Sequence, residues 1–387
     1  MSKLRVGIIG CGGIANSKHM SALKDIKEVE MVAFCDIILE KAQKAVKEYG
    51  TPDAKAYEDY KELLKDETID VVHVCTPNRS HSFITIDALE SGKHVMCEKP
   101  MAKTYEEAVK MCEVAEKTGK KLSIGYQNRC TAENAYVKAC AEKGEFGEMY
   151  YANAYAVRRR AVPTWGVFLN EYEQGGGPLI DIGTHALDMT LWIMDNYEPE
   201  MVVGQTFRKL ADKEEQGNDW GPWDANKFTV EDSAFGFIKM KNGAVINLQS
   251  SWALNVADPN EACYTICGDK GGVDTRDDKV VVNYIKNQRQ VIETPSFENG
   301  GAAFFEGISA DSPKDVEARK WVNCILNDTE VPVPPRQALC VTKILEGIYK
   351  SAETGKPVYF NDWGVRVWNL QFNYIQFVTI LKMVMIY

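Results

Sequence analysis

The sequence has no excess of positive charge and no long uninterrupted apolar segment within its first 360 residues. Its 45 lysines and arginines are outnumbered by 55 aspartates and glutamates, which gives a formal net charge of -10. Such an acidic chain is poorly suited to binding nucleic acid or an anionic membrane surface. The start, MSKLRVGIIGCGG, has no small-residue cleavage site, so we expect no secretory leader and no membrane partner.

Paired cysteines are also missing. The eleven cysteines are spread from Cys11 to Cys340, and no two of them have CxxC spacing. This spread argues against a disulfide framework and against a zinc site, so we expect no bound metal. We expect a cytoplasmic protein with reduced thiols.

The order of apolar runs divides the chain into parts. Over residues 1–125, short apolar runs alternate with amphipathic helical stretches, which predicts an α/β fold with βαβ units and a parallel sheet. From about residue 145, strand-like runs follow one another, and two are joined by an Asn242-Gly243 turn. Residues 126–360 are therefore predicted to form an α+β domain with a largely antiparallel sheet.

The last part, residues 361–387, is unusually apolar and prone to form strands. Polar residues interrupt it, so it is a poor candidate for a membrane span. It is either buried in an oligomer contact or an atypical end, and the sequence leaves both interpretations open.

A glycine-rich turn directly follows the first predicted strand. The segment GCGGIA fits the dinucleotide pattern G-x-G-x-x-G/A, and Asp36 ends the second predicted strand, where an acidic residue binds the adenosine ribose. The alternative is a tight turn with a capping aspartate. Because the following Ile37 and Ile38 offer no cation for a 2′-phosphate, NAD is favoured over NADP. The predicted cofactor contacts here are Gly10, Gly12, Gly13, Ile14 and Asp36.

Further polar residues follow the third predicted strand. Thr76, Pro77 and Asn78 lie at its carboxyl end, where open α/β sheets bind ligands, and we expect them to contact the cofactor. His81 comes just after them. It either contacts the cofactor or is a helix-start side chain bonded to the backbone.

The helical segment over residues 175–192 carries four polar residues in an otherwise apolar sequence. Asp181, Thr184, His185 and Asp188 have the spacing i, i+3, i+4 and i+7, which predicts one common face. His185 is the only one of the five histidines beyond the first domain and is the best candidate base. Asp181 could orient His185 or stabilise the helix start, and the group could also be no more than a solvated stripe.

At Glu98-Lys99-Pro100 the pattern becomes specific. Together with the glycine turn, the segment TPNRSH and the segment DIGTHALD, it resembles the glucose–fructose oxidoreductase / inositol dehydrogenase (Gfo/Idh/MocA) family over roughly residues 3–360. The resemblance implies a Rossmann domain, a second domain whose open sheet often forms oligomer contacts, and hydride transfer between NAD(P) and a carbohydrate or polyol. The family's catalytic residues match Lys99, Asp181 and His185.

Other side chains are expected at the same edge. Lys99 could bond the substrate oxygen, and Lys99, Glu98 and Gln127 are all expected to contact the cofactor. Tyr126, Arg158 and Trp165 are predicted, with the three catalytic residues, to bind substrate, although the arginine could equally form salt bridges. Trp220 and Trp223 could line a pocket or fill one.

The sequence therefore predicts an NAD-dependent dehydrogenase acting on a ring hydroxyl of a sugar, polyol or glycoside, forming a homo-oligomer, a dimer or a tetramer. Two alternatives remain open. One is an enzyme that retains NAD and cleaves glycosides by transient oxidation, and the other is a non-catalytic sensor of a sugar or NAD.

Overall fold

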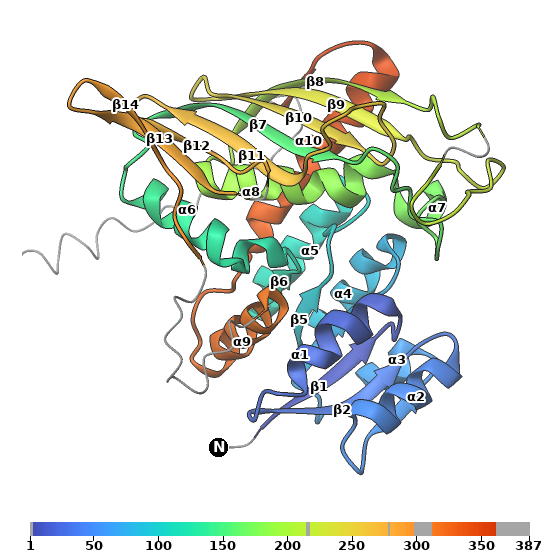
Figure 1. Ribbon diagram of the computed structural model, residues 1–387. Helices are drawn as coiled ribbons and strands as arrows, with labels where there is room; N and C mark the ends of the chain where they lie inside the picture. Colours follow the sequence, from blue (N-terminus) through green and yellow to red (C-terminus); the bar gives the residue numbers. More distant parts are fainter. Residues whose placement is uncertain (1–2, 214–216, 278, 298–311, 361–387) are drawn as a thin grey trace, which may run out of the picture.

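The computed structural model describes residues 3–213, 217–277, 279–297 and 312–360. Two sheets dominate it, and helices lie between them (Figure 1). The predicted α/β class, a parallel nucleotide-binding sheet followed by a mostly antiparallel sheet, is confirmed. The predicted apolar segment over residues 361–387 lies outside the described residues. No helix within the described ranges is long and apolar enough to cross a membrane.

The first sheet has six parallel strands in the order β3-β2-β1-β4-β5-β6. The order reverses between β1 and β4, so the carboxyl ends of these strands border the crevice where such sheets bind ligands. The strand β3 was not predicted, because it is only three residues long and lies at the partly exposed edge. The strands are Leu4–Ile9, Val29–Cys35, Lys55–Tyr57, Val71–Val74, His94–Cys97 and Leu122–Ile124 for β1 to β6.

Helices connect these strands at the predicted places. The clearest case is α5, where Thr104 and Glu107 form a reciprocal capping box and Gly119 ends the helix with a φ of 64°. A π-helical turn, η1, precedes α1 directly after the glycine-rich turn. The bounds are Ala15–Met20 for η1, Ser21–Leu23 for α1, Leu39–Tyr49 for α2, Tyr60–Leu64 for α3, His81–Glu90 for α4 and Tyr105–Thr118 for α5.

The second sheet has nine strands in the order β14-β13-β12-β11-β7-β10-β9-β8-β15. Only β7 and β10 are parallel neighbours. The Asn-Gly turn joins β9 and β10 as predicted, and Gly243 has a φ of 90° there. The strands β7 to β15 are Met149–Val157, Pro199–Phe207, Ser233–Met240, Val245–Ser251, Glu261–Gly268, Gly271–Asp274, Val281–Lys286, Arg289–Glu293 and Val358–Tyr359.

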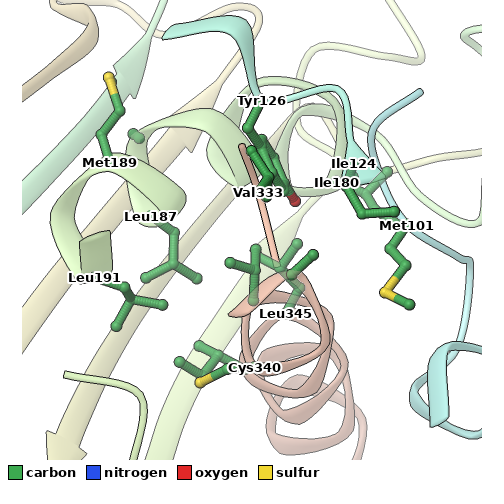
Figure 2. Close-up of a cluster of buried hydrophobic side chains, with 14 of the residues drawn as sticks. Met101, Ile124, Tyr126, Ile180, Leu187, Met189, Leu191, Val333, Cys340 and Leu345 are labelled. Carbon is green, nitrogen blue, oxygen red and sulfur yellow. The ribbon is translucent and has the colours of Figure 1, made fainter. Parts of the chain in front are cut away.

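Helices α8 (Thr184–Met194) and α10 (Pro335–Thr354) pack under the second sheet and against the first domain (Figure 1). Ile124 of β6 belongs to the same buried cluster as Leu187 of α8 and Leu345 of α10 (Figure 2). Side chains of both domains therefore share one core.

Helix α9 (Pro313–Leu326) returns to the first domain. Its fully buried Trp321 belongs to the same cluster as Ile8 of β1 and Met20 of η1. The boundary between residues 125 and 126 therefore divides the sequence but not the hydrophobic cores. Helix α9, from the second part of the chain, completes the core of the first domain. Neither α9 nor α6 (Ala132–Glu142) was predicted.

Candidate active site

The glycine-rich turn leaves room for a ligand. A side chain at Gly10, whose φ is 89°, would lie 2.7 Å from the carbonyl oxygen of Cys75, so only glycine fits there. A Cβ at Gly12 or Gly13, by contrast, would meet nothing within 4 Å. The helix begins at this open position, where its free N–H groups favour a phosphate.

Asp36 lies directly beside this turn. Its Oδ2 atom accepts a hydrogen bond from the Cys11 N–H over 2.9 Å, and Oδ1 accepts one from the Ile38 N–H over 2.9 Å. The next residue, Ile37, is 83% exposed and apolar, so it offers no positive charge for a 2′-phosphate at the ribose position. This turn and carboxylate fit NAD, and the contacts expected of Gly12, Gly13 and Ile14 with its pyrophosphate stay a prediction.

At the end of β4, Asn78 and His81 are held by the protein itself. Asn78 donates to the carbonyl oxygen of Gln174 over 3.0 Å, and both ring nitrogens of the buried His81 lie 2.8 Å from carbonyl oxygens, those of Pro100 and Thr76. These contacts match the backbone-bonded alternative for His81. The buried Oγ1 of Thr76 has no partner in the described part of the chain and keeps its hydrogen-bonding capacity for a ligand.

Glu98 is buried in an ionic cluster. Its Oε1 atom lies 2.6 Å from Lys18 Nζ and 2.8 Å from His19 Nε2, and Lys18 also contacts Glu317 Oε2 of α9 at 2.9 Å. Burial raises the pKa of Glu98, but Lys18 and His19 outweigh it and hold the pKa well below its usual range. Glu98 therefore anchors the loop that carries Lys99, and its predicted cofactor contact stays a prediction.

Lys99 and Asp181 meet across the two domains. Lys99 Nζ donates to Asp181 Oδ1 over 3.0 Å and to the Asp181 carbonyl oxygen over 2.9 Å. Trp252, at the end of β10, donates from Nε1 to Asp181 Oδ2 over 3.0 Å. Burial raises the pKa of Asp181, but the charge of Lys99 outweighs it, so the pKa stays below its ordinary value.

The helix start that carries Asp181 is capped by Glu231. The Glu231 carboxylate accepts the N–H groups of Gly177 and Leu179 over 2.8 and 3.1 Å, and the Tyr349 hydroxyl over 2.9 Å. Burial raises the pKa of Glu231 to about 7. Because Glu231 caps the helix start, the side chain of Asp181 is free for Lys99 and Trp252, while its place in the first turn still favours the helix dipole.

His185 lies one turn beyond Asp181. Its ring packs edge-on against Tyr126, with centroids 6.0 Å apart, and its buried Nδ1 has no partner among the described residues. Burial, followed by the charge of Lys99, lowers the pKa of His185 to about 3. The imidazole is therefore neutral at physiological pH, which is the form that accepts a proton.

The four polar residues of this segment are buried or half-buried, so they do not form the solvated stripe that was one of the two interpretations. Residues Leu179–Gly183 form a π-helical turn, η4, before α8, which changes the spacing. Thr184 is buried and its Oγ1 lies 2.6 Å from the Tyr126 hydroxyl. Asp188 is buried in a two-bond pair with Arg129, at 2.5 and 2.9 Å. Both support the helix from within.

Arg158 contacts both an acidic and an aromatic side chain. Strand β7 ends at Val157, so Arg158 directly follows its last residue. Arg158 bonds Glu261 over 2.6 and 2.5 Å and lies 5.2 Å from the Trp220 ring, which packs against the 52% exposed Trp165.

The remaining expected residues have different places. Tyr126 is buried and its hydroxyl is used by Thr184, so it supports His185 from behind. Gln127 begins the short helix η3 (Gln127–Cys130) at the end of β6, where its cofactor contact stays a prediction. Trp223 is buried and its Nε1 atom donates to the carbonyl oxygen of Ala211, so it fills a pocket and does not line one. Sequence reasoning missed Trp252 and Glu231, because nothing local in their segments links them to residues 177–181.

Comparisons with known proteins agree with this geometry. Residues 4–126 match the oxidoreductase family with an NAD-binding Rossmann fold (Gfo/Idh/MocA), and residues 138–360 match that family's C-terminal alpha/beta domain. The chain is 35% identical to D-glucoside 3-dehydrogenase of Escherichia coli (strain K12) over 357 residues, which are 92% of this chain and 97% of that protein.

Solved structures share the fold. Levoglucosan dehydrogenase in complex with NADH and levoglucosan has a TM-score of 0.78 at 22% identity, covering 92% of this chain and 99% of that one. Aldose-aldose oxidoreductase from Caulobacter crescentus has a TM-score of 0.74 at 25% identity, with 92% and 99% covered. The glycine turn, the Lys99–Asp181 contact and both matched domains lead to one conclusion: the chain belongs to the Gfo/Idh/MocA family of NAD-binding oxidoreductases.

Proposed function

We propose that the protein transfers a hydride between NAD and a ring hydroxyl carbon of a sugar, polyol or glycoside. One observation carries this proposal. Lys99 from the first domain binds Asp181 from the second, beside a neutral His185 and at the carboxyl edge of the nucleotide-binding sheet. Such a group supplies a hydrogen-bond donor and a proton acceptor to one alcohol.

The residues divide the work on the substrate alcohol. NAD, when bound, would supply the hydride acceptor for the carbon that carries the hydroxyl. His185 takes the hydroxyl proton, and Lys99 donates a hydrogen bond to the oxygen as it gains negative charge. Asp181 holds the ammonium of Lys99 in position and is itself held by Trp252. In the reverse direction, His185 returns the proton to the oxygen.

A glucoside is the first substrate class to test, because the E. coli relative is named a D-glucoside 3-dehydrogenase. The purified protein is assayed for NADH formation with free sugars, inositols and glucosides, and Lys99→Ala and His185→Ala are compared with the exposed-site control Lys110→Ala. We expect each active-site variant to lose about 100-fold or more in kcat while NADH still binds.

Three outcomes of this assay separate the alternatives. NADH formation that is unchanged in both active-site variants contradicts the proposed mechanism. Release of the aglycone without net NADH indicates the NAD-retaining cleavage of glycosides. Ligand binding with no turnover of any substrate in the panel indicates a sensor.

We also propose that the protein is a homo-oligomer that pairs through the outer face of its second sheet. The helices cover one face of this sheet, and side chains such as Val203, Phe207 and Phe237 are 36–38% exposed on the other. Exposed faces of antiparallel sheets are usually polar, so this apolar face favours an interface. A cytoplasmic location fits the eleven free cysteines.

A further inference from the structure

A cavity of about 460 Å³ lies between the start of β11 and the N-terminal end of α6. It is separate from the Lys99–Asp181–His185 cluster, and no residue expected at the active site lines it. Its wall is rich in amide and charged groups, which both donate and accept hydrogen bonds. The residues that matter here are Glu133, Asn134, Asn260, Glu261, Asp277 and Lys279.

Three neighbouring strand ends connect this cavity to the active site. Val157 and Ser251 are paired in register, so the following residues, Arg158 and Trp252, lie side by side. Trp252 bonds Asp181, and Arg158 bonds Glu261 in the cavity wall. Since adjacent strands are about 4.8 Å apart, the wall begins about 10 Å from Trp252.

Helix α8 gives a second, independent connection. Asn134 of the cavity wall donates from Nδ2 to the sulfur of Met189 over 3.1 Å. Met189 follows His185 by one helical turn, so Asn134 connects the cavity wall to the helix that carries the candidate base. The cavity wall and the active site are therefore linked through two sets of contacting residues.

The shape and charge of the cavity limit what it binds. About 460 Å³ is far more than a methyl or other small aglycone needs. The amide of Asn260 suits a hydroxyl group, since both groups donate and accept hydrogen bonds. The three carboxylates of Glu133, Glu261 and Asp277 outnumber the ammonium of Lys279, which disfavours a phosphate or a uronate.

Building on the proposed dehydrogenase function, we propose that this cavity binds a neutral sugar residue as the aglycone of the substrate. The preferred substrates are then uncharged disaccharides or longer glycosides. One ring presents its hydroxyl to His185, and the next ring lies in the cavity beyond Arg158. Sugar phosphates and nucleotide sugars are disfavoured.

The test compares kcat/KM for methyl glucosides with kcat/KM for neutral disaccharides and for a sugar phosphate. The double variant Glu133→Ala/Lys279→Ala removes two exposed cavity groups, and Glu142→Ala, on the far end of the same helix, is the matched control. We expect the wild type to prefer at least one disaccharide by about tenfold, and the double variant to lose this preference. Methyl glucoside kinetics should stay unchanged in all three proteins.

Equal kcat/KM for methyl glucosides and every disaccharide, or a double variant that affects both classes equally, overturns the cavity assignment alone. Absence of turnover with every sugar, methyl glucosides included, contradicts the proposed function instead. In that case calorimetry with the NADH-loaded protein decides the cavity question. Disaccharide binding that weakens in the double variant supports the assignment, and absent or unchanged binding overturns it.

Discussion

Among single residues, Asp181 has the most demanding position. Its two carboxylate oxygens are shared between Lys99 of one domain and Trp252 of the other, and the bond to the Trp252 indole fixes the carboxylate from the sheet side. Trp252 is fully buried, so it acts on the substrate only through Asp181. It is a positioning residue.

We predict that Trp252→Phe lowers kcat/KM by about tenfold, because a hydrogen bond to a charged group is lost while most of the ring volume stays. Steady-state kinetics and an NADH titration measure the change, and the affinity for NADH should not move. Trp223→Phe is the matched control, since it also removes a buried indole bond of 3.0 Å, far from Asp181. Equal losses in both variants would mean that the effect is structural.

The histidine in the site makes stability depend on pH. The pKa of His185 is about 3 when folded and 6.5 as the reference value, so the unfolded chain takes up the proton first as pH falls. The stability that the neutral, buried His185 contributes is fully present above about pH 6.5 and is lost as the pH falls toward 3. At pH 5 the loss is about 2 kcal/mol, since one pKa unit equals 1.36 kcal/mol.

We therefore predict that the free energy of unfolding of the wild type falls more steeply between pH 7.5 and pH 5 than that of His185→Asn. Urea denaturation at both pH values measures the difference. The buried His73 and His81 also have lowered pKa values, but they are present in both proteins and cancel in the comparison. Identical slopes would show that His185 titrates normally.

Among the elements, the joined helices η4 and α8 carry the chemistry and depend on a cap from outside their own segment. Glu231 accepts two backbone N–H groups at the helix start with its two oxygens. Close packing of the glycines makes this possible, because a Cβ at Gly177 would lie 2.2 Å from the Glu231 carbonyl oxygen.

We predict that Glu231→Gln lowers the free energy of unfolding by about 1–3 kcal/mol, since an amide has only one acceptor oxygen for the two N–H groups. The value of kcat should fall as well, because Asp181 and His185 follow the cap. Thermal unfolding and kinetics at pH 8 measure both effects. Tyr349→Phe removes only the hydrogen bond from the Tyr349 hydroxyl to Glu231. It should lower the free energy of unfolding by about 1 kcal/mol and leave kcat unchanged. A fall in kcat as large as that of Glu231→Gln would argue against the role of the cap.

The elements also show what the sequence can predict. The alternation of strands and helices, the glycine turn and the Gly175–Trp192 segment were found, because each has a local pattern. The strand β3 was missed because its three partly exposed residues carry no pattern. The helix α6 was also missed, but its start could have been predicted, because Thr131 is a recognisable N-cap residue. The bonds from Trp252 and Glu231 to residues 177–181 span 52–71 positions and have no local signal.

Across the whole molecule, the buried ionic cluster joins distant parts of the chain. Lys18 lies between Glu98 at the end of β5 and Glu317 of α9, and all three are buried. Loss of one partner in such a cluster leaves an incompletely compensated charge in a poorly solvated place.

We predict that Glu317→Gln costs about 3 kcal/mol in the free energy of unfolding, the lower end for breaking a buried pair, since Lys18 keeps Glu98. Asp328→Asn is the control, because Asp328 is 94% exposed in its pair with Lys121 and its replacement should leave the free energy of unfolding nearly unchanged. Chemical denaturation measures both. Similar costs would mean that the buried cluster adds nothing special.

The exposed apolar sheet face is tested at the same scale. We predict that Val203→Lys/Phe237→Lys shifts the protein from oligomer to monomer, because two ammonium groups would be buried without partners. Light scattering coupled to gel filtration measures the mass. Phe83→Lys, at a 44% exposed site on α4 in the other domain, should leave the mass unchanged. A wild type that is already monomeric contradicts the proposed interface.

The return of α9 to the first domain has a consequence during protein synthesis. The nucleotide-binding sheet can form while the ribosome is still translating the second domain, but the groove for Trp321 stays open until residue 326 has emerged. Until then Lys18 has only one of its two carboxylate partners. The first domain therefore stays incomplete while about 200 further codons are translated. During that time its uncovered apolar surface is a target for chaperones.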